Sequence, residues 1–308
     1  MSKSILVPTD FSDCSAAAYS YAALLAEKSD ATIYLLHVLD IPSPSLSANG
    51  NKETRMDTHF MMEMMQLTKA RMGKIRNGKT FKGADVEEII ELGSVPEMIL
   101  KAAQKYKIDM IVMGTHGRNG LQEKFIGTNA EKIVRNAGIP VLSVKHAMKN
   151  PKLDTILFAA DFSKETEEIL PAVSHIAKLL KAKLVLAKII TLNNFETSSQ
   201  TEKLIEKFRG RNKAFEFSTS IYYADSKEEG IRRSAGALGA DMIALGTHGK
   251  NGLSHLFQGS IAEDVVSHAS LPVFTVNFHR LPATSGWKVQ GKNIRKYDSD
   301  LLYQIPSV

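Results

Sequence analysis

Two loops of this 308-residue chain carry the same spacing of glycine and hydroxyl residues. Residues 114–128 contain G-T-H-G, nine further residues and then G-T, and residues 246–260 contain G-T-H-G, nine further residues and then G-S. Glycine lets a backbone approach a ligand closely, and the free N–H groups at the start of a helix bind phosphate. Each loop follows an apolar strand pattern and precedes a helical pattern. The spacing therefore indicates two phosphate-binding loops.

The end of each loop also matches a helix-start signal. Thr128 and Ser260 each open an S/T-x-x-E pattern, which predicts a capping box and a helix that begins at the hydroxyl residue. Such a helix would direct its first N–H groups at the loop. A capping box by itself only starts a helix, but the glycines in front of it favour an anion site, and Arg118 and Lys250 provide a cation in each loop.

A carboxylate follows the first predicted strand of each repeat. Asp10 and Asp161 both stand in a D-F-S sequence at a strand end. Open α/β sheets bind ligands beyond the carboxyl ends of their strands. Neither G-x-G-x-x-G after the first strand nor a Walker-type loop is present, so the phosphates are expected at the later glycines. The aspartates are left to accept hydrogen bonds from ribose hydroxyls.

The only other candidate catalytic groups near the loops are the histidines of the two G-T-H-G sequences. His116 and His248 could act as general acid–base groups or phosphate ligands, or could be structural hydrogen-bonding residues, which is the interpretation we favour. Phosphoryl transfer needs a positioned nucleophile and usually Mg²⁺, and no carboxylate pair at metal-ligand spacing is found. The pattern favours nucleotide binding with slow hydrolysis at most, and a catalytic ATPase is the alternative.

The chain is a tandem duplication. Residues 110–146 and 242–278 align without a gap, and 18 of the 37 positions are identical. Equivalent residues of the two repeats are 132 positions apart in this region and 151 positions apart at the first strand of each repeat. The first repeat therefore holds 19 extra residues, which we place between Pro42 and Gly50 and in the helix that follows. We predict domains at 1–147 and 152–278 and a C-terminal extension at 279–308.

Apolar runs alternate with helical patterns in each repeat, which is typical of a parallel α/β sheet. We predict two domains with a Rossmann-like fold, each a five-stranded parallel open sheet with helices on both faces. Ser12 is the predicted N-cap of the first helix. The predicted strands are 4–8, 32–39, 85–91, 109–114 and 140–146, then 154–160, 183–190, 214–223, 241–246 and 272–278.

A methionine-rich segment at 54–77 is predicted to be a lengthened second helix that acts as an interface or a lid. Its residues Met56, Met61, Met62, Met64, Met65 and Met72, with His59, also match a Cu(I) site, but methionine at helical spacing more often fills a core or a flexible contact. No metal site is predicted.

Composition bounds the remaining possibilities. The single Cys14 excludes an intrachain disulfide, and neither a leader pattern nor an apolar run of membrane-spanning length is found. We expect a soluble, cytoplasmic protein without a membrane partner. The net charge of +6 is mild, and the basic tail, with Trp287 and Tyr297, is interpreted as folding back on a domain rather than binding nucleic acid.

These features together resemble the universal stress protein family, in its ATP-binding branch and in tandem, which implies the adenine nucleotide alpha hydrolase-like type of Rossmann-like fold. The resemblance rests on the strand–Asp start, the glycine loop and the final P-V-L and P-V-F strands at 140–142 and 272–274, and it covers 1–146 and 152–278. It implies adenine near Pro8, Thr9, Asp10 and Val38, ribose near Asp10 and Met113, and phosphates at Gly114, His116, Gly117, Arg118, Gly127, Thr128 and Asn129. The counterparts are Ala159, Ala160, Asp161, Ile189, Leu245, Gly246, His248, Gly249, Lys250, Gly259, Ser260 and Ile261.

By this resemblance the protein is a stress-response regulator that binds ATP, ADP or AMP, with Mg²⁺ as a candidate companion. A slow ATPase or autophosphorylating enzyme is the first alternative, and a nucleotide-free interaction module is the second. Family members pair through their fifth strands, so the two domains would form an internal pseudo-dimer, and the chain would then form a homodimer. Ala159 replaces Pro8 and Lys188 replaces His37, which predicts a weaker adenine pocket in the second domain.

Overall fold

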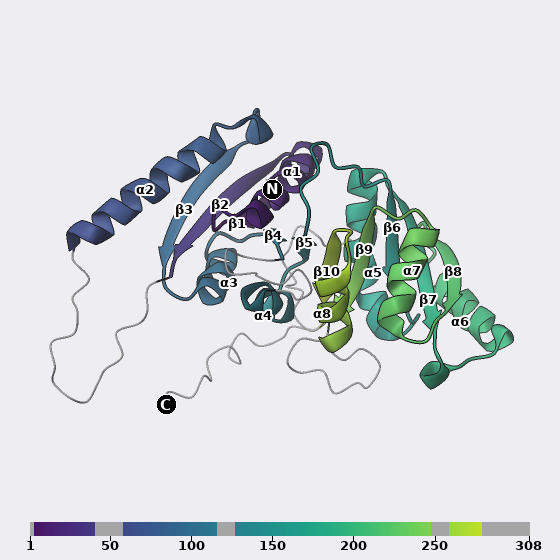
Figure 1. Cartoon of the computed structure of the whole chain (residues 1–308). Helices are drawn as coiled ribbons and strands as arrows, with labels where there is room; N and C mark the ends of the chain where they lie inside the picture. The colour runs from purple at the N-terminus through teal and green to yellow at the C-terminus, as the bar shows by residue number, and fades with distance from the viewer. Residues whose placement is uncertain (1–2, 41–57, 116–126, 248–258, 279–308) are drawn as a thin grey trace, which may run out of the picture.

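The computed structural model describes residues 3–40, 58–115, 127–247 and 259–278, and it is drawn in Figure 1. We call residues 3–146 the first half and residues 152–278 the second half. The elements of the first half are β1 (Lys3–Pro8), α1 (Asp13–Ser29), β2 (Ala31–Leu39), α2 (Thr58–Arg76), η1 (Lys79–Phe81), β3 (Val86–Leu92), α3 (Val95–Lys105), β4 (Met110–Gly114), α4 (Thr128–Asn136) and β5 (Val141–Val144).

The second half repeats this order. Its elements are β6 (Thr155–Ala159), α5 (Lys164–Leu180), β7 (Lys183–Ile190), η2 (Leu192–Asn194), α6 (Ser198–Arg211), β8 (Ser218–Tyr223), α7 (Lys227–Ala237), β9 (Met242–Thr247), α8 (Gly259–His268) and β10 (Val273–Asn277). The strand-and-helix alternation expected from the sequence is confirmed in both halves.

All ten strands join one sheet, in the order β3-β2-β1-β4-β5-β10-β9-β6-β7-β8. Within each half the neighbouring strands are parallel. The two fifth strands pair antiparallel, with Leu142 opposite Phe274. The internal pairing that the family resemblance implied is therefore present, and it makes one continuous sheet of the two predicted sheets.

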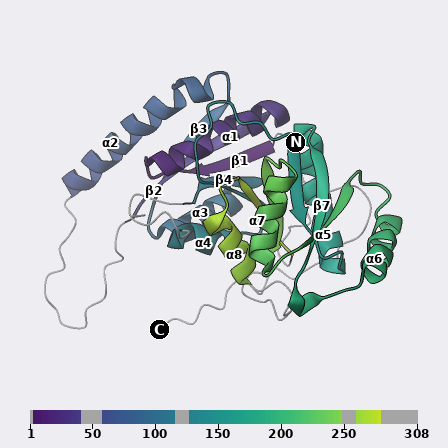
Figure 2. The ribbon, with the colours of Figure 1, turned by 45° about the vertical axis from the view of Figure 1, so that its right-hand side comes forward.

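Helices cover both faces of the sheet (Figures 1 and 2). On one face, α1, α2, α5 and α6 share a single apolar cluster that runs through both halves and includes Leu142 and Phe274. On the other face, α3 and α4 pack over the first half, and α7 and α8 pack over the second. Burial of apolar surface in the shared cluster stabilises the two halves together rather than separately.

Several predicted strands are longer than the strands of the structure, and the largest difference is at 214–223. This strand begins at Ser218, because Phe215 N donates to Asn212 O in a turn that follows α6. The helix expected at 54–77 is confirmed over Thr58–Arg76, and residues 54–57 lie outside the described residues. Of its methionines, Met72 is fully buried, whereas Met62 and Met65 are exposed. No helix within the described ranges is long and apolar enough to cross a membrane.

Candidate functional site

The turn between β1 and α1 holds Asp10 at the carboxyl edge of the sheet. Asp10 Oδ1 accepts hydrogen bonds from Ser12 N, at 3.0 Å, and from Ser12 Oγ. Ser12 in turn caps α1 by accepting from Ser15 N. Phe11, between them, has φ of 63°, a left-handed conformation that a bulky residue rarely adopts. Strained backbone of this kind is concentrated at functional sites.

The second half builds the same turn at the end of β6. Phe162 also has φ of 63°, and Asp161 Oδ1 accepts from Ser163 N at 3.0 Å. Here the second hydrogen bond to Oδ1 comes from Thr166 Oγ1, at 2.7 Å, instead of from the capping serine. The repeated geometry shows that both D-F-S sequences fold in the same way.

Gly114 brings the end of β4 against the start of α1. A Cβ at this position would lie 2.3 Å from Cys14 O, so no larger residue fits without a backbone shift. Gly127 is brought to the same strand end, because Gly127 N donates to Thr115 O at 2.8 Å. Thr128 and Asn129 then open α4 as exposed residues. Asp10, Gly114 and the first turn of α4 therefore meet at the carboxyl edge, where β1 and β4 are neighbours.

The family of the chain follows from comparisons with known proteins. A family model described as the universal stress protein family matches residues 1–145 and 152–277. The chain belongs to the universal stress protein family. A universal stress protein of Methanocaldococcus jannaschii is 34% identical over 148 residues, which are 48% of this chain and 84% of that protein. One of Synechocystis sp. is 26% identical over 296 residues, which cover 89% of this chain and 99% of that protein.

The tandem universal stress protein fold also has solved counterparts. The crystal structure of a universal stress protein from Archaeoglobus fulgidus has a TM-score of 0.71 to this chain, at 22% identity, and covers 90% of this chain and 99% of that one. At this identity the likeness establishes the fold.

Several predicted site residues of the first universal stress protein repeat offer surface to a ligand. Pro8, Asp10, Val38, Gly114 and Gly127 are half-buried. Thr9 and Met113 are buried. The hydroxyl of Thr9 accepts from Phe11 N and is hydrogen bonded to Ser15 and Tyr19, so the Thr9 side chain holds the turn together. His116, Gly117 and Arg118 lie outside the described residues.

The predicted capping box at Thr128 is not formed, which corrects the sequence interpretation, and the hydroxyl of the second predicted box, on Ser260, lies outside the described residues. Gly127 is the N-cap of α4, and no side chain caps this helix. In the second half, α8 begins at Gly259, one residue before the predicted start. The glutamates of both patterns bind Arg135 instead: Glu131 at 3.1 Å and Glu263 through two guanidinium nitrogens. An arginine competes well with a backbone N–H because its hydrogen bond to the carboxylate is charge-assisted.

The predicted site residues of the second repeat are less exposed than those of the first. Asp161 is half-buried, and the buried residues are Ala159, Ala160, Ile189, Leu245, Gly246 and Ile261. His248, Gly249 and Lys250 lie outside the described residues, as does the side chain of Ser260, which follows Gly259 at the start of α8. Two groups that sequence reasoning missed also lie at this end: Glu196, which pairs with Lys188, and Phe278, whose ring covers Gly246. A lysine in the otherwise apolar run 184–190 was a signal that an acidic partner exists.

Two side chains near the aspartates have shifted pKa values. Burial, assisted by the charges of Asp10 and Asp13, raises the pKa of the Cys14 thiol, which keeps it protonated and unreactive at neutral pH. Burial lowers the pKa of Lys227, at the start of α7, and the charge of Asp161 opposes this shift. Within the described ranges, no group of three or more His, Cys, Asp or Glu residues could hold a metal ion.

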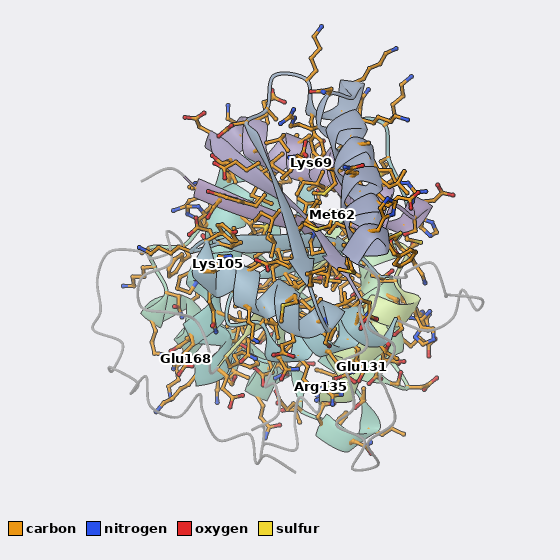
Figure 3. The ribbon with its side chains drawn as sticks, turned by 90° about the vertical axis from the view of Figure 1, so that its left-hand side faces the viewer. Met62, Lys69, Lys105, Glu131, Arg135 and Glu168 are labelled. Carbon is orange, nitrogen blue, oxygen red and sulfur yellow. The ribbon has the colours of Figure 1, made fainter. Side chains whose placement is uncertain are left out.

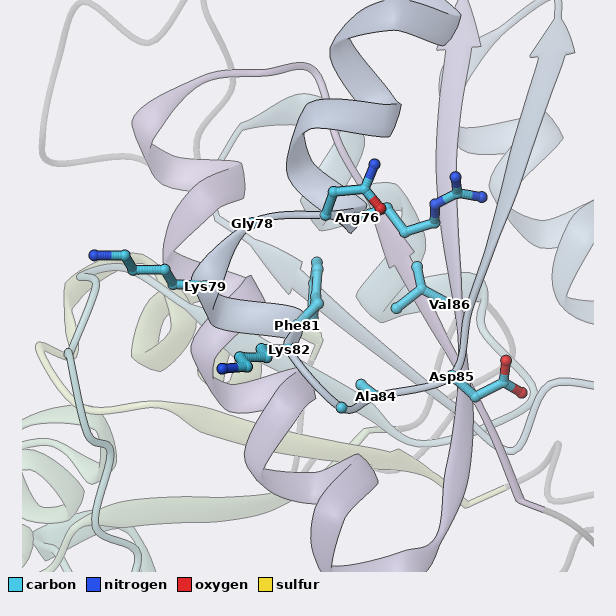
Figure 4. A pocket seen from close by; sticks show the side chains of 10 residues that line it. Arg76, Gly78, Lys79, Phe81, Lys82, Ala84, Asp85 and Val86 are labelled. Carbon is cyan, nitrogen blue, oxygen red and sulfur yellow. The ribbon is translucent and has the colours of Figure 1, made fainter.

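An open pocket of about 490 Å³ lies at the opposite edge of the sheet (Figure 4). It is formed between the end of α2 and the amino end of β3, with Arg76, Lys79, Lys82 and Asp85 among its lining residues. The strands are parallel, so this pocket is at the far end of the sheet from Asp10 and Gly114. It plays no part in the candidate site.

Proposed function

We propose that this chain is a stress-response regulatory protein that binds an adenine nucleotide at the carboxyl edge between β1 and β4. The observation that carries the proposal is the convergence of the Asp10 carboxylate, Gly114 and the uncapped first turn of α4. A carboxylate, a close-approach glycine and helix N–H groups are complementary to ribose hydroxyls and phosphates. Membership of the universal stress protein family supports this assignment.

Each group has a distinct task in this proposal. Asp10 accepts hydrogen bonds from the ribose, and the half-buried Pro8 and Val38 contact the base. The N–H groups at the start of α4 donate to phosphate oxygens, where the helix dipole also favours negative charge. ATP, ADP, AMP and cyclic nucleotides share these features, and Mg²⁺ would accompany the di- and triphosphates.

Binding is tested with the full chain by isothermal titration calorimetry with ATP, ADP, AMP and cyclic AMP. We expect saturable binding that Asp10→Asn abolishes. Asp30→Asn is the matched control, since it removes the same charge from the other end of α1, and asparagine accepts the left-handed conformation of that position, φ 52°. Failure of every nucleotide to bind the wild-type chain would support the nucleotide-free interaction module instead.

Regulation rather than catalysis is the preferred interpretation of the bound nucleotide. Steady-state hydrolysis is expected to stay below roughly one turnover per minute, whereas typical enzymes turn over about 1–10³ times per second. Faster hydrolysis that Asp10→Asn removes would establish an ATPase. Homodimerisation of the chain, also proposed, is measured by multi-angle light scattering.

A further inference from the structure

We infer that side chains of the second half close its nucleoside site, so that the chain holds one adenine nucleotide, in the first half. This inference rests on the proposed function and names which of the two repeats performs it. Four differences between equivalent positions of the halves carry it.

The first difference is at the glycine that ends the fourth strand of each half. Gly114 is half-buried, and its close neighbour is the backbone of Cys14. Gly246 is buried, and a Cβ there would lie 2.0 Å from Cζ of Phe278. The Phe278 ring therefore lies directly against the glycine surface. The equivalent residue of the first half is His146, which is exposed.

The second difference is on the base side of the site. Val38 is half-buried at the end of β2 and keeps surface for a base. Its counterpart Ile189 is 7% exposed, because the first turn of α7 lies on it. A Cβ at Gly230 would be 2.3 Å from Ile189 Cγ2, and the equivalent residue in the first half is Met98. Because Gly230 has no side chain, α7 packs closely against Ile189, at the position where a base would bind.

The third difference is an ion pair beside that position, between the buried Lys188 and the half-buried Glu196. Lys188, which is 3% exposed, donates to Glu196 at 2.9 Å, and Thr201 Oγ1 donates to the same carboxylate at 3.2 Å. In the first half, His37 is half-buried, and its Nδ1 donates to the backbone carbonyl oxygen of Thr9 at 2.7 Å. The centroids of the His37 and Phe11 rings lie 4.4 Å apart. A satisfied ion pair of a buried lysine is costly to disturb, because an unpaired charge would remain inside the protein.

The fourth difference is a positive charge near the strand-end aspartate. Lys227 stands at the start of α7, where the first half has Val95. Burial lowers the pKa of Lys227 and the charge of Asp161 opposes this shift, so the second half has a lysine near this carboxylate where the first half has an apolar side chain. Ala159 is also buried, whereas its counterpart Pro8 is half-buried, so the second half presents less surface to a nucleoside than the first.

The wild-type full chain tests the inference by two measurements. Equilibrium dialysis with radiolabelled ATP counts nucleotides per chain, and 8-azido-ATP followed by peptide mass spectrometry locates the base. We expect one ATP per chain and crosslinks confined to peptides of residues 3–146. Asp10→Asn should reduce both signals to background, while the control Asp30→Asn should not change them. Far-UV circular dichroism checks that both variants fold.

The outcomes separate the inference from the proposed function. Two ATP per chain, or crosslinks in peptides of residues 152–278, overturn the inference and leave nucleotide binding standing. An absence of bound ATP in the wild-type chain overturns the proposed function, and the inference with it. Competition of unlabelled ATP against 8-azido-ATP with a single-site profile adds to the expected result.

Discussion

Arg135 of α4 donates through Nε to Oε1 of Glu263 of α8, at 2.8 Å, and so joins the two halves of the chain. Glu131 is its second carboxylate partner, at 3.1 Å, and Figure 3 shows Arg135 beside Glu131. Both α4 and α8 follow the glycine loops, and they lie side by side in Figures 1 and 2. One guanidinium thus joins the two helices that follow these loops.

Two hydrogen bonds around this ion pair obey the internal symmetry of the repeats. Lys145 Nζ donates to Ser267 O at 2.7 Å, and Asn277 Nδ2 donates to Arg135 O at 3.3 Å. Lys145 is equivalent to Asn277, and Arg135 to Ser267, at the repeat offset. The arginine itself breaks the symmetry, because serine replaces it in the second half.

The Arg135–Glu263 pair is predicted to stabilise the junction measurably. In a double-mutant cycle of Arg135→Met and Glu263→Gln, we expect a coupling free energy of about 1 kcal/mol, since both side chains keep some solvent exposure and the pair is partly screened. Urea unfolding at low and high salt measures it. A coupling near zero, or one that salt does not weaken, would contradict an electrostatic link.

The two strand-end glycines are predicted to differ in their tolerance of a methyl group. Gly114→Ala should lower the free energy of unfolding by roughly 1–3 kcal/mol, because the Cys14 backbone must move. In Gly246→Ala the added methyl group contacts the far end of the Phe278 side chain, so the free energy of unfolding should fall by less than in Gly114→Ala. The same substitution should cost still less in a chain that already carries Phe278→Ala. Thermal unfolding without nucleotide compares the variants.

Gly236→Ala in α7 is the control for these glycine substitutions. Nothing lies within 4 Å of a Cβ at Gly236, so alanine should be neutral or stabilise the helix by up to about 1 kcal/mol. Equal losses at all three positions would show that close packing is not the cause.

The ion pair between the buried Lys188 and Glu196 is predicted to respond unequally to loss of each partner. Glu196→Gln leaves a lysine whose side chain is only 4% exposed without its counter-charge, and it should lower the free energy of unfolding by about 3–5 kcal/mol. Lys188→Met should cost less, since Glu196 keeps 32% exposure and can be hydrated. Chemical denaturation measures both. Glu229→Gln, which breaks the exposed pair with Arg233, is the control and should change stability by less than about 0.5 kcal/mol.

A histidine at the junction is predicted to make stability depend on pH. Burial, with the charges of Lys3 and Lys178, lowers the pKa of His175 below its usual 6.5. The unfolded chain therefore binds this proton more readily, and stability should be fully present above pH 6.5 and fall as the pH drops toward the lower folded pKa. Lys3 Nζ donates to Nε2 of His175 at 3.3 Å, which the neutral ring allows.

Urea unfolding of the wild type and His175→Gln at pH 7.5 and 5.5 measures this dependence. The wild type should lose more stability than the variant over that interval, because the variant has no proton to bind at this position. An equal loss in the two proteins would assign the acid sensitivity to other groups.

Much of the fold could be read from local patterns. Nearly continuous apolar runs such as 184–190 are expected where helices cover both faces of a parallel strand. Ser12 is identifiable as a helix cap because a serine hydroxyl accepts a hydrogen bond from a free helix N–H. The repeated D-F-S sequence located the Asp10 turn, and the repeated glycine spacing located the loop that begins at Gly114. Both features are visible in the sequence, because each is a short local pattern that occurs twice.

The partners of polar side chains were decided by tertiary structure. Glu131 and Glu263 both follow the capping pattern, and no local signal shows that an arginine between the two helices will take both carboxylates. Likewise, Phe278 meets Gly246 and Gly230 meets Ile189 only because the sheet and α7 bring them together. The sequence by itself determined the repeated architecture and the place of the candidate site. Packing between distant segments decided which repeat keeps exposed surface at its candidate site, because the burial of a residue depends on the segments that pack against it in the folded chain.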